Sequence, residues 1–226
     1  MCTFRINYLF IFLLISDYIP SLTNTTFAFV ESNYLERSYP VIITDSHEPM
    51  STTDLYELIF NKSLDFLKSN PCDVSTNLML NKFFDIELAL RKAWNLYNPD
   101  DKWFLQIRNC QFKAVKSSRN FIKRPYYYPV HLEPFYSSWL LMAHNYEQKF
   151  KQEIYLQGLV IVQQLWGTME LSLNAKEPCA NCPHINVVLK EGEGLIFSTD
   201  LWRLNYKFVS GENENIATIM EIDWNI

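Results

Sequence analysis

The apolar residues before residue 100 recur with helical spacing. The segment 82–97 carries them at intervals of three or four residues, so that they share one face of a helix: Ile86, Leu90, Ala93, Trp94 and Tyr97. Asn98-Pro99 ends this helix, because proline disfavours helical backbone at the residue before it. The segment 50–67 shows a similar spacing and predicts a second helix, with Asp54 as its expected N-cap.

After residue 100 the period shortens toward two, which is typical of strands. Short alternating or fully apolar runs follow one another with turn residues between them, at 103–108, 159–165, 169–173, 185–189, 194–197, 204–208 and 216–222. Another apolar run, Ser38–Asp45, predicts a buried strand before the helices. Helices followed by many short strands predict an α+β chain whose C-terminal part closes into a jelly-roll barrel.

The N-terminus is typical of a secretory signal peptide. A short basic start precedes the apolar run 6–15, and small polar residues follow near Ser21 to Thr23. The run is shorter than the roughly 20 residues that span a bilayer. We therefore expect a signal peptide at 1–23, a single domain at 24–226, and no membrane span after cleavage. The expected location is outside the cell or in the lumen of the endoplasmic reticulum, although the C-terminus carries no KDEL-type signal.

Two further features fit that compartment. Asn24 and Asn61 each begin a glycosylation sequon. Removal of the leader leaves four cysteines, and an even number in an oxidising compartment predicts disulfides. Three pairings are possible, and we favour Cys72–Cys110 with Cys179–Cys182. The CxxC pair has two other interpretations: a redox motif, and a zinc site with His184 nearby.

Composition narrows the classes of partner. A 226-residue chain with 48% apolar and 15% aromatic residues has enough apolar side chains for a complete core. The net charge of −5 argues against a nucleic-acid partner, which requires a concentrated basic face. The basic cluster between Lys113 and Arg124 is interpreted as a solvated surface.

Four segments resemble the JmjC (Jumonji C) family of cupin-like proteins. They are Ser38–Asp45, the stretch beginning at Trp139, the strand–Gly–strand run Leu159–Ala175, and Val187–Tyr206 with its acidic Gly turn and tryptophan. Their order and spacing follow the family layout over most of the chain. The resemblance implies N-terminal helices followed by a double-stranded β-helix. It also implies Fe(II) held by a His-x-Asp/Glu pair and a distal His, with a lysine that anchors 2-oxoglutarate.

The functional positions implied by that resemblance hold other residues here. The first ligand pair falls on Ile154 and Leu156, the lysine position on Met169, and the distal histidine position on Arg203, followed by Leu204. A buried arginine at 203 would require an anion, either Glu170 or Asp200 or a small acidic ligand. The expected protein is thus a secreted JmjC/cupin-like pseudoenzyme, a binding or scaffolding module with no cofactor. Its partner would be an unknown protein or a small acidic ligand.

One pair of residues supports the alternative of an active Fe(II)/2-oxoglutarate-dependent hydroxylase with rearranged ligands. His131 and Glu133 form a His-x-Glu pair within RPYYYPVHLEPF, and His144 or His184 would have to complete the metal site. Pro129 and Pro134 flank the pair and favour an extended loop. We expect instead that the RPYYYP segment packs its aromatic rings against the barrel.

Overall fold

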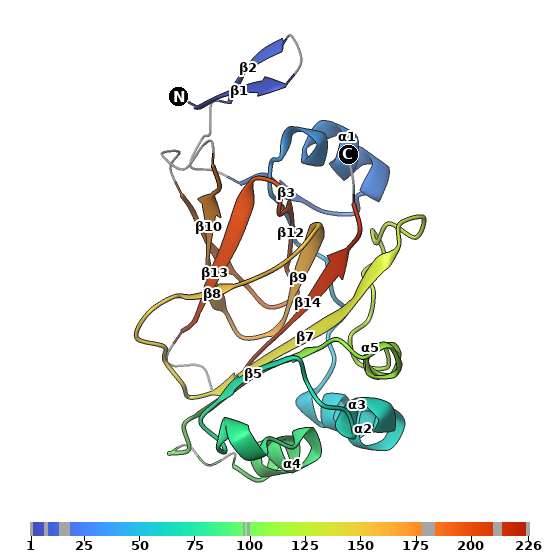
Figure 1. Ribbon diagram of the computed structural model, residues 1–226, viewed down its shortest axis with the longest axis vertical. Coiled ribbons are helices and arrows are strands. Elements are labelled where there is room, and N and C mark those ends of the chain that lie inside the picture. Colours follow the sequence, from blue (N-terminus) through green and yellow to red (C-terminus); the bar gives the residue numbers. More distant parts are fainter. Residues whose placement is uncertain are drawn as a thin grey trace.

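The computed structural model describes residues 2–6, 9–13, 19–96, 98, 100–177, 184–209 and 214–224. Figure 1 shows a barrel of antiparallel strands with helices gathered mainly at one end. The helices are α1 (Phe27–Asn33), α2 (Thr52–Lys62), α3 (Leu64–Leu67), α4 (Ile86–Asn95) and α5 (Phe112–Ser118), with short 3-10 turns η1 (Leu35–Arg37) and η2 (Asn81–Phe83). Among these, no helix is long and apolar enough to cross a membrane.

Polar side chains begin the longer helices. Ser51 caps α2 by accepting a hydrogen bond from the backbone N–H of Asp54, and Asp85 caps α4 by accepting one from Leu88. The expected cap at Asp54 is therefore wrong by three residues, since Asp54 lies in the first turn. Its carboxylate accepts a hydrogen bond from the Ser51 hydroxyl.

Eight strands build the barrel, and they divide between two sheets that face each other. In chain order they are β7 (Pro134–His144), β8 (Gln152–Ile154), β9 (Leu159–Trp166), β10 (Met169–Ala175), β11 (Ile185–Leu189), β12 (Gly194–Ser198), β13 (Trp202–Phe208) and β14 (Asn215–Ile222). The spatial order is β12-β9-β14-β7 in one sheet and β11-β10-β13-β8 in the other. This alternation between sheets is the double-stranded β-helix, so the predicted fold class is confirmed.

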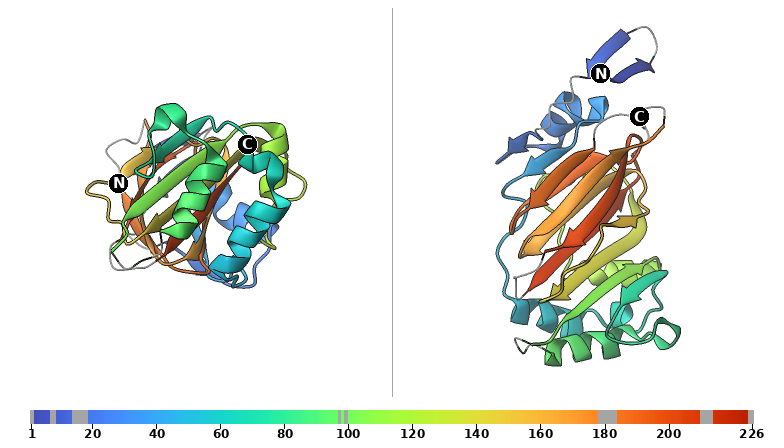
Figure 2. Two further views of the ribbon diagram at one scale, coloured as in Figure 1. Left: turned by 90° about the horizontal axis from the view of Figure 1, so that it is seen from below. Right: turned by 90° about the vertical axis from the view of Figure 1, so that its left-hand side faces the viewer.

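The first of these sheets extends beyond the barrel at both edges. β4 (Val41–Ile43) and β3 (Ser21–Leu22) continue it beside β12, while β6 (Trp103–Asn109) and β5 (Asp73–Thr76) continue it beside β7. The strand expected at Ser38–Asp45 is therefore shorter and lies near an edge. β1 (Cys2–Ile6) and β2 (Leu9–Leu13) form a separate hairpin that projects from the far end of the molecule (Figures 1 and 2). Cleavage of this segment stays a prediction.

The core of the described residues consists of three clusters, one between the two barrel sheets and two on the outer face of the large sheet. Between the two barrel sheets, side chains from both fill the interior, among them Trp139, Val162, Leu171, Trp202 and Phe208. On the outer face, α2, α3 and α4 pack their apolar faces on β6 and β7, as the views in Figure 2 show. Tyr127 and Tyr128 pack on the barrel beside Leu159 and Ile161, as expected of the RPYYYP segment, whereas Tyr126 is exposed.

The disulfide Cys72–Cys110 is confirmed, and it joins the outer ends of the paired strands β5 and β6. Cys179 and Cys182 lie outside the described residues, so their pairing and the redox and zinc interpretations stay predictions. Both sequon asparagines, Asn24 and Asn61, are exposed, and their glycosylation also stays a prediction.

Candidate functional site

Three of the four positions implied for a metal and its cosubstrate, Ile154, Leu156 and Met169, are apolar and lie inside the barrel. Ile154 ends β8 directly opposite Leu204 on β13, and Leu156 follows in the next loop. Ile154, Leu156, Met169 and Leu204 are all 7% exposed or less and belong to the interior core. Fe(II) binds imidazole and carboxylate ligands, and none of these side chains supplies one. The residues present therefore do not fit an iron site at these positions.

Arg203 lies on the opposite face of its strand. Side chains of β13 alternate, so Trp202, Leu204, Tyr206 and Phe208 point inward and are buried, whereas Arg203 is exposed. The expectation of a buried arginine paired with Glu170 or Asp200 is wrong, because strand alternation turns residue 203 to solvent. Asp200 accepts a hydrogen bond from Ser198 instead. The inward residue after Trp202 is Leu204.

His131 and Glu133 lie in the loop before β7, and both are exposed. The His131 ring packs 5.7 Å from the ring of Phe27, and the backbone carbonyl of Glu133 accepts a hydrogen bond from the N–H of Asp223. His144 ends β7, ten residues after the strand begins at Pro134, so it lies roughly 30 Å from the loop that holds His131 and Glu133. Throughout the described segments, no three His, Cys, Asp or Glu side chains gather in a metal-binding group.

A polar network at one end of the interior was not predicted. Glu221 on β14 is fully buried and pairs with Arg108 on β6 at 3.1 Å. Its carboxylate also accepts hydrogen bonds from the Trp139 indole N–H at 3.0 Å, the Gln157 backbone N–H at 2.9 Å and the Ser137 hydroxyl. The Arg108 guanidinium lies 5.0 Å from the Trp139 ring centre, within cation–π range. Since Gln157 directly follows Leu156, this ion pair lies beside the positions implied for the first two iron ligands. The charges of Glu221 and Arg108 neutralise each other.

A second polar group inside the barrel is also satisfied. The Tyr206 hydroxyl donates a hydrogen bond to the Gln106 side-chain oxygen at 2.6 Å, and Gln152 lies at 3.4 Å. Burial raises the pKa of Tyr206 well above its ordinary value, so the phenol stays protonated and serves as a donor. This tyrosine therefore links the two sheets through hydrogen bonds.

No protein-family model and no curated protein matches the chain. Among solved structures, it is similar to the ribosomal oxygenase YcfD from Escherichia coli, with TM-score 0.47 and 10% identity over 88% of this chain and 51% of that one. An X-ray structure of E. coli ycfD gives TM-score 0.47 and 11% identity, covering 89% and 54%. A mutant of Bacillus subtilis oxalate decarboxylase OxdC gives 0.35 and 10%, covering 54% and 26%.

The chain spans about half the length of the YcfD chains that it matches. Likenesses this distant carry no argument about activity, and the fold assignment rests on the strand order of the two sheets. The chain therefore has a cupin-like double-stranded β-helix fold.

Proposed function

We propose that this protein is a JmjC/cupin-like binding or scaffolding module that performs no Fe(II)/2-oxoglutarate chemistry. One observation carries the proposal: the apolar side chains of Ile154, Leu156 and Met169 fill the positions implied for the first ligand pair and the cosubstrate anchor. Ile154 on β8 lies opposite Leu204 on β13, and both side chains belong to the apolar interior, so neither strand offers a metal ligand at this point.

The chemistry of the cosubstrate supports the same conclusion. A dicarboxylate requires a cation to anchor it, and the corresponding residue Met169 is neutral and fully buried. The cation Arg108 is already engaged by Glu221. A carboxylate entering here would displace packed side chains and find no donor. The protein therefore binds its partners on outer surfaces of the barrel.

The location proposed for this module is the secretory pathway or the extracellular space. The Cys72–Cys110 disulfide supports it, because such bonds persist in oxidising compartments. The partner proposed is a protein or a small acidic ligand.

Anaerobic calorimetry tests the proposal with Fe(II) and 2-oxoglutarate titrated separately and together. We expect no stoichiometric binding, and the same result for His131→Ala and Glu133→Ala. The rival hydroxylase would bind iron with a Kd of about 10 μM or tighter and lose that binding in both variants. That outcome would make His131 and Glu133 metal ligands and would reject the proposed function.

A further inference from the structure

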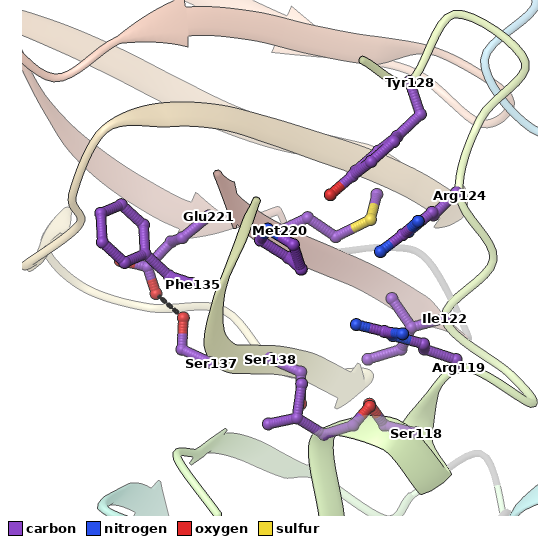
Figure 3. Close-up of a pocket in the computed structure, with 12 residues that line it drawn as sticks. Ser118, Arg119, Ile122, Arg124, Tyr128, Phe135, Ser137, Ser138, Met220 and Glu221 are labelled. Carbon is purple, nitrogen blue, oxygen red and sulfur yellow. Dashed lines mark hydrogen bonds between the residues drawn. The ribbon is translucent and has the colours of Figure 1, made fainter. Parts of the chain in front are cut away.

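A small pocket lies on the barrel surface. It opens where the start of β7 and the end of β14 meet the C-terminus of α5 and the segment 119–128 that follows (Figure 3). We call it the arginine pocket, because the side chains of Arg119 and Arg124 both extend into it. Its polar lining also includes Ser118, Tyr128, Ser138 and Glu221.

The charge of the pocket is unbalanced. Within the described part of the chain, neither Arg119 nor Arg124 forms a salt bridge. The acidic residue in the lining, Glu221, is fully buried and already binds Arg108, so it does not neutralise the two guanidinium groups. Two cations therefore face a common space with no counterion from the lining.

One of the two arginines, Arg124, is held against an aromatic ring. The Arg124 guanidinium lies 4.3 Å from the centre of the Tyr128 ring, a cation–π distance. Burial raises the pKa of Tyr128, and the charges of Arg124 and Arg119 act against that rise, as expected of two guanidiniums beside one phenol. Figure 3 shows the Tyr128 hydroxyl pointing toward the same space. The pocket is thus preorganised, since Arg124 is positioned before any ligand arrives.

A buried hydroxyl in the pocket wall needs a partner. Ser138 on β7 is 4% exposed, and its Oγ makes no hydrogen bond with any described residue. A buried unsatisfied hydroxyl costs free energy on folding, which an acceptor supplied by a ligand would recover. Ser118 differs, because its hydroxyl already donates to the carbonyl of Val115.

We propose that the arginine pocket binds a tetrahedral oxyanion, the phosphate or sulfate head of a small ligand. Its donors come from the end of α5, from the following segment and from β7, and a tetrahedral oxyanion presents acceptors in all of these directions. Val115, Ile122, Phe135 and Met220 form an apolar part of the lining that suits a short hydrocarbon body. This inference rests on the proposed binding role and gives that role its ligand class.

Calorimetry with the mature protein tests the inference, using phenyl phosphate, phenyl sulfate, benzoate and phenol as probes. We expect the phosphate or the sulfate to bind, benzoate to bind at least about tenfold more weakly and phenol not at all. Competition by inorganic phosphate and inorganic sulfate then shows which head is preferred. Failure of both oxyanion probes to bind at ~10 mM would overturn the inference.

Three variants separate a built site from a diffuse basic surface. Arg119→Gln and Arg124→Gln should each weaken binding about tenfold, because each loses a charge-assisted hydrogen bond. The matched control Lys113→Gln/Lys116→Gln removes two charges from exposed positions of α5 outside the lining and should change affinity less than about twofold. An equal loss in the control would show a general polyanion surface and reject the site.

Ser138→Ala provides a readout that a purely structural residue would not give. It should weaken binding of the oxyanion probe about threefold or more while leaving the thermal midpoint unchanged or higher, since it removes an unsatisfied buried hydroxyl. Unchanged affinity in this variant would overturn the role of Ser138. Iron binding in the separate metal titration would instead reject the proposed function, whatever the oxyanion probes do.

Discussion

The buried Glu221 network offers the sharpest test of how the barrel end is stabilised. Glu221→Gln keeps the side-chain volume but removes the charge. One carboxylate oxygen binds Ser137, Trp139 and Arg108, and the other binds the Gln157 N–H and Arg108. The amide therefore retains the most bonds with its oxygen in the first position, and its NH₂ group then faces the Gln157 N–H.

The cost follows from those contacts. The Gln157 N–H loses its acceptor, which costs about 1–3 kcal/mol for a buried donor. Arg108, whose side chain is 20% exposed, keeps its charge without a carboxylate partner, and partial access to water limits the penalty. We expect the free energy of unfolding to fall by roughly 2–4 kcal/mol.

Urea denaturation followed by tryptophan fluorescence measures this loss, provided that the m-value stays constant. Glu87→Gln is the matched control, because Glu87 pairs with Arg91 at the surface with side chains 38% and 57% exposed. That substitution should cost about 0.5 kcal/mol or less. If Glu221→Gln cost no more than the control, the network would not stabilise the fold and this reasoning would be refuted.

Three further predictions concern other parts of the fold. Replacing both Cys72 and Cys110 by serine should lower stability by about 4 kcal/mol, because the bond closes a loop of 38 residues; a loss under ~1 kcal/mol in urea titrations would contradict this. Gly158→Ala should lower the thermal midpoint strongly, since φ is +66° and a Cβ would collide with the Ile222 carbonyl. Gly192→Ala is the control: its φ is +82° but the space around it is open, so the substitution should cost only about 1 kcal/mol. Equal shifts in the thermal midpoint of the two variants would be inconsistent with a steric cause. Burial, followed by the charge of Lys123, lowers the pKa of His47 below 6.5 despite the opposing Glu48 and Glu191. The folded state therefore favours the neutral ring, so His47 contributes to stability fully above pH 6.5 and progressively less as pH falls below it. Between about pH 7.5 and pH 5, the free energy of unfolding should change less in His47→Gln than in the wild type. Identical pH dependence of the two proteins would exclude His47 as a cause.

Local patterns predicted the elements of this fold because they depend on neighbouring residues alone. The apolar face of α4 and the alternation of β13 are both present in the chain as written. The start of α2 was misplaced because Ser51, Thr52, Thr53 and Asp54 all have cap-forming side chains, and only backbone geometry decides among them.

The candidate sites were harder to predict, since they depend on pairing between distant strands. Arg203 was assigned to the interior, although a shift of one residue along a strand reverses the face of its side chain. The Glu221 network joins residues 108, 137, 139, 157 and 221, and nothing in the spacing of these residues indicates that they meet. The basic cluster was interpreted as a solvated surface, and only the fold shows that Arg119 and Arg124 line a pocket whereas the lysines of the cluster do not.

The apolar filling of the barrel restricts how a metal site could be introduced. A metal triad would require imidazole or carboxylate groups at 154, 156 and 204 together, all of them buried among hydrocarbon. Each single replacement would bury an unsatisfied polar group at a cost of several kcal/mol, against a typical total stability of about 5–15 kcal/mol. No intermediate would gain metal affinity in return, because one or two ligands do not hold the ion. A metal triad at these positions therefore has to be introduced as a set of three substitutions, and variants that carry only one or two of them should be less stable than the parent protein.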